Sequence, residues 1–199
     1  MTVELFEIAR YMRMGRNLPE GELAVRVERI RGEALKVVRP VRVWRRFPIE
    51  GGAISSGGLS LEIRGTIAEH LTGCRAAYLV CGTIGVGFDA LQRRVSISSG
   101  VDALVAQAIG AALIEKWMDD TNVEIAKELA PGETLIKRYS PGYGDFPLEK
   151  QRTLLAILDA SRTVGVSLTN TLLMVPSKSV SAIVGVKPPS PAPRASEGL

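Results

Sequence analysis

The stretch RYSPGYGDFPLEKQ, residues 138–151, combines one arginine, two glycines, two prolines and three aromatic residues just before a helix-like segment. A proline–glycine pair favours a sharp turn, and glycine adopts backbone angles that other residues avoid. Gly142 and Gly144 would let the backbone approach a ligand with its N–H groups exposed. Arg138 offers a planar fork for a carboxylate or phosphate, and Tyr143 offers an aromatic face or hydroxyl beside it. The stretch therefore predicts either a small-ligand site or an elaborate structural turn.

The rest of the chain mixes helical and extended patterns and shows no internal repeat. Apolar residues three and four positions apart, as at Leu23, Val27 and Ile30, predict helices, whereas β-branched runs bounded by glycine predict strands. Helices are expected at residues 3–14, 20–38, 65–71, 101–129 and 145–161. Strands are expected at residues 41–47 and 58–65, and a central strand that ends in a glycine turn is expected within residues 75–87. A short strand is expected just before the loop of residues 138–151, and a final strand or hairpin within residues 165–186, with a turn at Pro176.

Glycines and one glutamine interrupt two of these elements. Gly82, Gly85 and Gly87 give G-x-x-G-x-G, which is not the G-x-G-x-x-G order of dinucleotide-binding proteins, so tight packing is the expected reason for them. The apolar first half of residues 101–129 is the expected core helix. Gln107 and Gly110 interrupt that half, and they serve either core packing or ligand contact.

Composition narrows the class of protein. The length of 199 residues predicts one domain, and a composition of 46% hydrophobic and 23% charged residues predicts a soluble, globular protein. No apolar run approaches the roughly 20 residues that span a bilayer, and no secretory signal is visible, so we expect a cytoplasmic protein without a membrane partner. Cys74 and Cys81 suit neither a disulfide framework nor a zinc site and are expected as buried thiols. His70 is expected at the surface or at a helix end rather than in catalysis.

Positive charge is concentrated near the N-terminus. Residues 1–50 hold 11 Lys and Arg against 7 Asp and Glu, whereas the remaining residues hold 14 of each. Four arginines surround Trp44 and Phe47 in RPVRVWRRFP, residues 39–48, a pattern that can bind nucleic acid. The favoured interpretation is a strand whose arginine stems cover apolar surface, or a patch for an acidic partner. We therefore expect no nucleic-acid partner.

Two ordered motifs at a matching separation give the chain a family resemblance. The first, R-x-[AS]-P-G-Y, lies at Arg138, Ser140, Pro141, Gly142 and Tyr143. The second, G-x-x-L-T-x-x-x-x-M-x-P-x-x-S-V-S, lies within GVSLTNTLLMVPSKSVS at residues 165–181. Together they resemble the reductive-activation domain of cobalamin-dependent methionine synthase. RRFPI and IAEHLTGC also look similar to short free-standing members, so the resemblance covers most of residues 1–186.

The resemblance implies an α+β fold, with a twisted antiparallel sheet and packed helices in a single domain of residues 1–186. It also implies a groove for S-adenosylmethionine, in which the arginine matching Arg138 binds the methionyl carboxylate and Tyr143 lies near the sulfonium. The cofactor-binding residues are thus expected to be Arg138, Ser140, Pro141, Gly142 and Tyr143. Residues 187–199, KPPSPAPRASEGL, are proline-rich and are expected to form a disordered tail.

The implied function is that of a reactivation subunit. It would bind S-adenosylmethionine and present the methyl group for reductive methylation of cob(II)alamin, carried by a separate corrinoid-binding methionine synthase that lacks its own activation domain. A flavodoxin-like protein or a ferredoxin would supply the electron. Because cobalt is the nucleophile, the transfer needs positioning rather than a catalytic acid or base. We therefore expect no catalytic residue and no metal ligand, only an accessory role for this chain.

The chain also departs from the longer form of the family. There, S-V-S is followed by G-W-Y, whose tyrosine contacts the ligand, whereas here Ser181 is followed by Ala182, Ile183 and Val184. The D-x-H-x-x-G signature of corrinoid-binding domains is absent, so cobalamin would belong to the partner. Two alternatives stay open. One is an activator of another corrinoid methyltransferase, and the other is a non-catalytic interaction module with the same fold.

Overall fold

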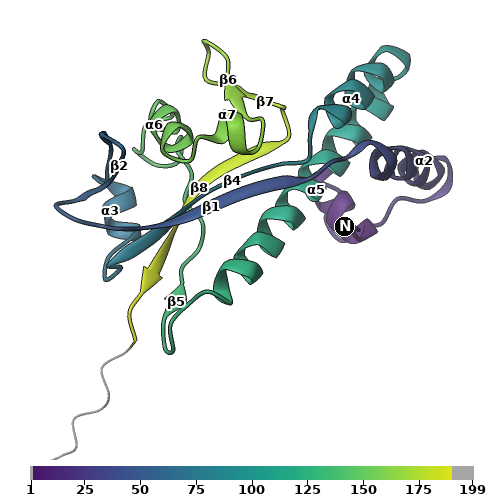
Figure 1. Cartoon of the computed structure of the whole chain (residues 1–199). Coiled ribbons are helices and arrows are strands. Elements are labelled where there is room, and N and C mark those ends of the chain that lie inside the picture. Colours follow the sequence, from purple (N-terminus) through teal and green to yellow (C-terminus); the bar gives the residue numbers. More distant parts are fainter. Residues whose placement is uncertain (1, 190–199) are drawn as a thin grey trace, which may run out of the picture.

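The computed structural model describes residues 2–189, and its centre is a twisted antiparallel sheet in the strand order β1-β4-β8-β5 (Figure 1). The strands of this sheet are β1 (Val41–Pro48), β4 (Ala76–Thr83), β8 (Ser179–Lys187) and β5 (Thr134–Leu135). Two small hairpins lie outside it, β2 (Ala53–Ser56) with β3 (Leu59–Glu62), and β6 (Ser167–Leu168) with β7 (Met174–Val175). The pairs are antiparallel, so the expected α+β fold is confirmed.

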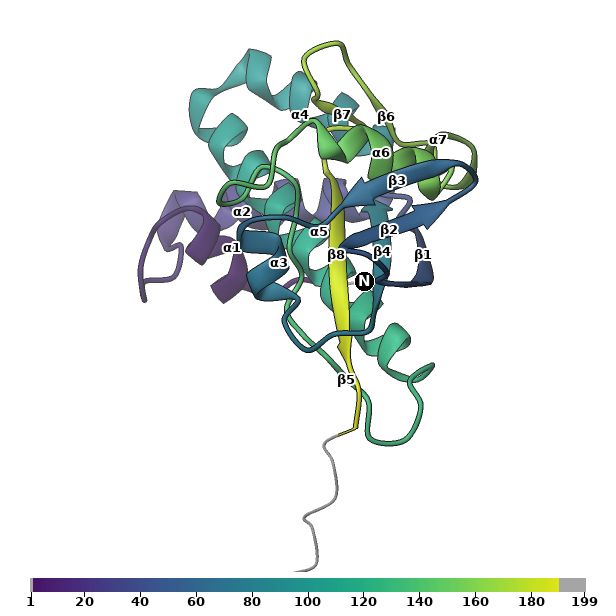
Figure 2. The same cartoon turned by 90° about the vertical axis from the view of Figure 1, so that its left-hand side faces the viewer.

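Helices make up most of the remaining structure. They are α1 (Leu5–Tyr11), α2 (Gly21–Val37), α3 (Thr66–His70), α4 (Val86–Ser98), α5 (Gly100–Ala126), α6 (Lys150–Ile157) and α7 (Ala160–Thr163). The long helix α5 runs along one face of the sheet, and α1, α2 and α4 gather around its first half (Figure 1). α3, α6, α7 and the β2–β3 hairpin cover the opposite face (Figure 2).

Strand β4 occupies the middle of the sheet because its side chains are apolar on both faces. It pairs with β1 on one side and with β8 on the other, and all of its residues after Ala76 are buried. A strand covered on both faces favours such a continuous apolar run. The central strand expected within residues 75–87 is therefore confirmed, and it ends at Thr83 before the glycine turn.

The two faces of the sheet belong to two separate hydrophobic cores. Ala182 and Val184 of β8 pack in the core under α5, whereas Cys81 and Ile183 pack in the core under α3, α6 and α7. Successive side chains of a strand point to opposite faces. Even-numbered residues of β8 therefore face α5 and odd-numbered ones face α6, which fixes the surroundings of the site described below.

The sequence-based prediction missed helix α4 and misplaced α6. Gly85, with a φ of 88°, precedes α4, and Gly87 lies so close to the Val37 carbonyl that a side chain cannot fit. Tight packing at these glycines is therefore confirmed. The helix expected at 145–161 begins only at Lys150, and it breaks at Asp159, whose left-handed φ of 51° separates α6 from α7.

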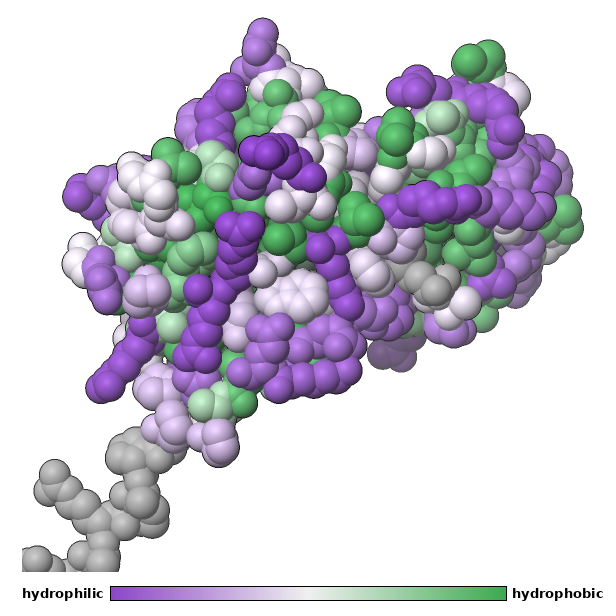
Figure 3. Space-filling view, in the orientation of Figure 1, coloured by the Kyte–Doolittle hydropathy of each residue, from purple (hydrophilic) through white to green (hydrophobic). Residues whose placement is uncertain are grey.

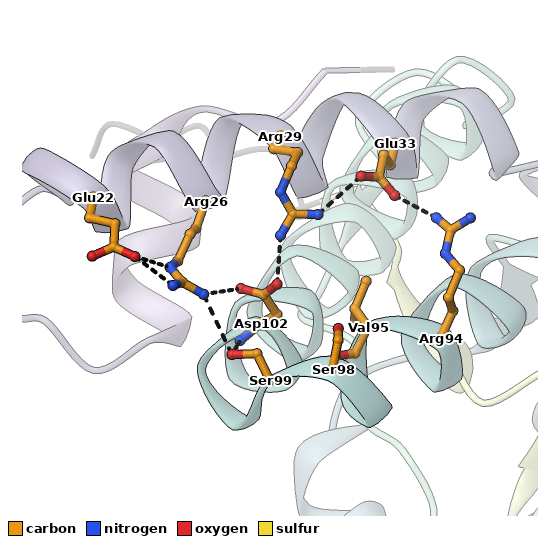
Figure 4. Close-up of polar contacts among 9 residues, drawn as sticks. All are labelled: Glu22, Arg26, Arg29, Glu33, Arg94, Val95, Ser98, Ser99 and Asp102. Carbon is orange, nitrogen blue, oxygen red and sulfur yellow. Dashed lines mark hydrogen bonds and ion pairs between the residues drawn. The ribbon is translucent and has the colours of Figure 1, made fainter.

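Helix α2 is joined to the start of α5 by a chain of ion pairs (Figure 4). Asp102 in the first turn of α5 is buried, and it accepts from Arg26 Nη1 at 3.0 Å and from Arg29 Nη2 at 2.5 Å. The same guanidinium groups continue to Glu22 and Glu33. Desolvation raises the pKa of Asp102, but the two guanidinium groups outweigh it and hold this pKa below its ordinary value. The network therefore stabilises the ionised carboxylate.

Two of the three arginines of the outer strand β1, Arg42 and Arg46, make contacts within the fold. The Arg42 guanidinium lies 5.3 Å from the Trp44 ring centroid and 4.3 Å from that of Trp117. Arg46 makes two bonds to Glu133, at 2.6 and 2.9 Å. Hydrophilic side chains gather over this strand in the space-filling view (Figure 3). The structure thus agrees with the favoured interpretation, in which arginine stems cover the apolar surface of a strand.

The cysteines and the histidine lie where the sequence suggests. Cys81 is fully buried, and burial raises the pKa of its thiol to about 12, while Cys74 is partly buried. Neither cysteine is disulfide-bonded. His70 ends α3, where its Nε2 lies 2.8 Å from the Lys137 carbonyl.

The structure describes residues 187–189, the first part of the segment that is expected to form a tail. Strand β8 extends to Lys187, the first residue of that segment, and residues 190–199 lie outside the described residues. Within residues 2–189, none of the helices combines the length and the apolar character needed to cross a membrane.

Candidate functional site

A cavity of about 650 Å³ opens at the edge of β8. Ser179, Val180 and Ser181 of β8 line its base. Helix α5 forms one side, and the segment of residues 137–143 with the start of α6 forms the other. The cavity therefore lies at the boundary between the two layers of helices that cover the sheet.

The cavity exists because the hydrogen-bond ladder along β8 stops early. The last bridge joins Tyr139 to Ile183 through two backbone bonds of 2.9 and 2.8 Å. Two residues further, the register places Pro141 opposite Ser181, and proline has no N–H to donate. The chain then turns away at Gly142, where φ is 93°. A gap is left in the edge of the sheet.

Arg138 reaches the cavity from this segment and is held by two carboxylates of α5. Its Nη2 lies 2.8 Å from Glu115 Oε2, and its Nη1 lies 2.9 Å from Asp119 Oδ1. Residues four apart on a helix share a face, which is why both carboxylates meet the same guanidinium. The Arg138 side chain is 16% exposed, against 42% and 68% for the two acidic side chains. The site thus presents one sheltered cation between two accessible anions.

Hydrogen bonds to α3 fix the loop that follows Arg138. Asp145 Oδ1 accepts from the Thr66 hydroxyl at 2.6 Å and from its N–H at 2.8 Å, and these bonds lower the pKa of Asp145. The Thr66 and Tyr139 hydroxyls lie 2.7 Å apart. A Cβ at Gly144, where φ is 55°, would lie 2.5 Å from Thr66 Oγ1. The contact with α3 therefore explains this glycine.

Four of the five predicted site residues line the cavity: Arg138, Ser140, Pro141 and Tyr143. The fifth, Gly142, does not. Its N–H donates to the Phe146 carbonyl at 2.8 Å, so the expectation of an exposed N–H at this glycine is wrong. Its left-handed backbone is nevertheless what turns the chain away from β8. Tyr143 lies at the rim with 67% of its surface exposed.

Sequence reasoning missed the residues that α5 contributes. Glu115, Asp119 and Asn122 recur at spacings of four and three within the charged second half of the helix, and this spacing is the signal of one common face. Asn122 Oδ1 is buried and has no hydrogen-bond partner among the described residues. The opposite side of the cavity adds Gln151, whose Oε1 lies 3.4 Å from the Ser181 hydroxyl.

Gln107 and Gly110 have a different role. The buried Lys178 side chain passes over Gly110, where a Cβ would lie 2.7 Å from Lys178 Cε, and its Nζ donates to Gln107 Oε1 at 2.7 Å. Gln107 also accepts from Gln92 at 2.9 Å. Burial lowers the pKa of Lys178. The two interruptions of the core helix thus accommodate a lysine from the turn before β8.

A second cavity, of about 310 Å³, shares Glu115 and Asp119 with the first. Its other side comes from the N-terminal segment and includes Glu4, Glu7 and Arg10. Acidic residues far apart in the sequence are therefore gathered next to the carboxylates that hold Arg138.

Comparisons with known proteins concern the same region. Residues 111–192 match the family model described as vitamin B12 dependent methionine synthase, activation domain. That range includes both sequence motifs and the carboxylates of α5. Among solved structures, the chain is similar to the MetH reactivation domain bound to AdoHcy, with a TM-score of 0.63 and 16% identity over 96% of this chain and 75% of that chain. The resemblance stated from the sequence is thus confirmed. A search of curated proteins finds no significant match.

Proposed function

We propose that this chain binds S-adenosylmethionine in the cavity beside β8 and acts as a reactivation subunit for a cobalamin-dependent methionine synthase. The observation that carries the proposal is the placement of Arg138 between Glu115 and Asp119. The methionyl end of S-adenosylmethionine is an α-amino acid zwitterion. Its carboxylate suits the fork of Arg138, and its ammonium group suits the carboxylates of α5. Binding would replace the internal ion pairs with pairs of the same kind.

The remainder of the cavity suits the rest of the ligand. Its volume of about 650 Å³ is typical of small-molecule sites, which span roughly 300–1,000 Å³. Leu148 and Met174 supply apolar surface, and Tyr143 at the rim supplies an aromatic face that attracts a sulfonium cation. The AdoHcy bound by the similar MetH domain is what S-adenosylmethionine becomes after losing its methyl group, which supports the same ligand class here.

The chemistry itself would be supplied by the ligand and by the partner. S-adenosylmethionine carries an electrophilic methyl group, and cobalamin on the partner, given one electron, is the acceptor. What remains for this chain is to hold the ligand with its methyl group toward the cavity mouth. Because Tyr143 is exposed at that mouth, the methyl donor stays accessible to a docked protein. A flavodoxin-like protein or a ferredoxin is the proposed electron donor.

The absence of the G-W-Y tyrosine is the observation that would favour the alternative of a non-catalytic module. Ala182, Ile183 and Val184 are fully buried in β8, on the two faces of the sheet. This departure is therefore a change within the packed sheet, and it leaves the Arg138 end of the cavity intact. An activator of another corrinoid methyltransferase remains the second candidate, because the same cavity would serve it.

Two measurements test the proposal. Calorimetric titration with S-adenosylmethionine should show binding at one site that weakens in Arg138→Ala. A second assay mixes the protein, S-adenosylmethionine, a one-electron reductant and the cob(II)alamin form of a methionine synthase from the same organism, and follows methylcobalamin by absorbance. Formation should accelerate when this chain is present. An equal rate without it would refute the reactivation role, and acceleration only with another corrinoid protein would favour the second candidate.

A further inference from the structure

Strand β1 forms the outer edge of the sheet, and half of its backbone groups point away from the protein. The Ile49 N–H donates to the Arg75 carbonyl at 3.0 Å in the register of the β1–β4 pair. Because backbone groups alternate along an antiparallel pair, odd-numbered residues of β1 turn their N–H and C=O groups to β4, and even-numbered residues turn theirs outward. The outward groups belong to Arg42, Trp44 and Arg46, and among the described residues they have no hydrogen bond.

The arginines that could shield this row of backbone groups are directed toward α5 instead. Exposed edge strands are commonly protected by charged side chains, by bulges or by being very short. Here the Arg42 guanidinium stacks on the Trp117 ring of α5, and Arg46 bonds to Glu133 in the turn after α5. The strand is eight residues long and pairs with β4 over its whole length. The edge therefore keeps the features of a strand that can pair with another.

Both tryptophans of the chain lie beside this edge and are fixed in place. Trp44 and Trp117 flank Arg42, with ring centroids 5.3 and 4.3 Å from its guanidinium. The Trp44 indole N–H donates to Glu128 at 2.9 Å, and the Trp117 indole N–H donates to the Val41 carbonyl at 3.2 Å. Both side chains remain partly exposed. Tryptophan and arginine are enriched at binding hot spots, and side chains fixed in advance lose less entropy on binding.

The charge of the edge indicates what kind of molecule it fits. Arg45 is exposed, and within residues 2–189 its guanidinium has no hydrogen bond or ion pair. With Arg42 and Arg46 it places three cations within five residues. A second copy of the chain fits poorly, because two β1 strands paired about Trp44 place Arg42 opposite Arg46, and like charges opposite each other are destabilising.

We infer that the outer edge of β1 binds an extended acidic segment of a partner protein, which adds to the sheet as a further antiparallel strand. The segment bonds through its backbone to the outward groups of β1, and its acidic side chains lie opposite the three arginines. Nucleic acid fits less well, because Arg42 already covers one face of each tryptophan ring on which a base could stack. No residue of β1 lines the cavity beside β8, so this inference is independent of the proposed function.

Capped peptides test strand addition by calorimetry on the full chain. The peptide VEETVE, running antiparallel to β1, places its glutamates opposite Arg46, Arg45 and Arg42. It should bind at least about tenfold more tightly than VKKTVK. N-methylation at its second and fourth residues blocks the N–H groups that face β1 and should weaken binding at least about tenfold, whereas N-methylation at its third and fifth residues should have little effect.

Hydrogen exchange in the ¹⁵N-labelled protein locates the bound peptide. The amides of Arg42, Trp44 and Arg46 should exchange rapidly in the free protein and more slowly with VEETVE bound. Those of Val43 and Arg45 should exchange slowly in both states, because they bond to β4. The neighbouring residues of one strand thus serve as controls for one another.

Two charge reversals separate the edge from the general basicity of the chain. Arg45→Glu should weaken the binding of VEETVE about fivefold, since an exposed attraction becomes a repulsion. Arg93→Glu makes the same change in net charge at another exposed position, on α4, and should leave the affinity unchanged. Equal losses in the two variants would show non-specific attraction and overturn the inference.

The other outcomes are equally decisive. Equal affinity of the two N-methylated peptides would exclude strand addition. Oligothymidylate that binds as tightly as VEETVE and leaves the exchange of the Arg42, Trp44 and Arg46 amides unchanged would assign the surface to nucleic acid. Absence of binding at millimolar VEETVE would overturn the inference and leave the proposed function standing.

Discussion

Arg138 and Glu115 lie 23 residues apart in the sequence, yet their side chains meet at the wall of the cavity, with 2.8 Å between guanidinium Nη2 and carboxylate Oε2. Asp119, one turn further along α5, occupies the second nitrogen of the same guanidinium. The pairs keep the arginine pointed at the site. They also supply the negative charge that a zwitterionic ligand needs at its other group.

Replacing Arg138 with alanine should weaken S-adenosylmethionine binding by about 1.5–3 kcal/mol, the range for a lost hydrogen bond between charged groups. The fold should survive, because Glu115 and Asp119 are accessible enough to be hydrated once the guanidinium is gone. Calorimetry gives the affinity and thermal unfolding gives the control. Arg138→Lys, which keeps the charge but loses the fork, should fall between the two proteins. A folded alanine variant with unchanged affinity would rule out this arginine as the carboxylate-binding residue.

The carboxylates of α5 can be tested separately. The double variant Glu115→Gln, Asp119→Asn should bind S-adenosylmethionine at least about tenfold more weakly, because the ligand's ammonium group loses both of its charged partners. Binding of 5′-methylthioadenosine, which lacks the amino-acid group, should change little, so the ratio of the two affinities is the informative quantity. Equal losses for both ligands would show that the substitutions disturb the cavity as a whole rather than the recognition of the ammonium group.

Gly144 and Gly57 offer a matched pair for the loop. Their φ angles are 55° and 57°, but a Cβ at Gly144 would lie 2.5 Å from Thr66 Oγ1, whereas a Cβ at Gly57 would meet nothing within 4 Å. Both alanine variants carry the cost of a left-handed backbone, about 1–2 kcal/mol. Gly144→Ala should lose roughly 1–3 kcal/mol more through the clash. Urea unfolding measures the difference, and equal destabilisation would show that the packing against α3 is unimportant.

The local features of the site could be predicted from the sequence, whereas its long-range partners could not. Proline and glycine restrict their own backbone, so the turn at residues 141–144 follows from the residue types. Glu115 and Asp119 lie in a helix whose charged half suggests only a solvated face. Their contact with Arg138 depends on how α5 crosses the sheet, and sequence spacing alone does not determine that crossing.

The gap at Ser181 shows the same limit. That Pro141 has no N–H is evident from the sequence, but the residue opposite it depends on the register of a pairing that spans 40 positions. The prediction of an exposed N–H at Gly142 was wrong for a related reason. The turn itself brings the Phe146 carbonyl back to accept a hydrogen bond from that N–H. Helix α4 was missed because the glycines before it were interpreted only as a turn.

The network around Asp102 leads to a prediction for acid stability. Asp102 accepts from Arg26 and Arg29, and these guanidinium groups hold its pKa below the ordinary value of about 3.9 despite the opposing effect of desolvation. A carboxyl group whose pKa is lowered on folding stabilises the protein fully above its unfolded pKa, and this contribution is lost as the pH falls through the folded pKa. Asp102→Asn should therefore be less stable than the wild type at pH 7.

The two proteins should converge under acid conditions. At pH 7 the free energy of unfolding of Asp102→Asn should be lower than that of the wild type by about 1.5–3 kcal/mol, the range for hydrogen bonds to a charged group. This difference should become smaller once the pH drops below about 4. Urea unfolding across pH 3 to 7 measures it. Asp120→Asn on the same helix removes an exposed pair with Lys116 and should change the free energy of unfolding by less than about 1 kcal/mol. Two outcomes would show that the buried carboxylate does not stabilise the contact between α2 and α5. One is a loss of unfolding free energy in Asp102→Asn that stays constant down to pH 3, and the other is a loss at pH 7 as small as that of Asp120→Asn.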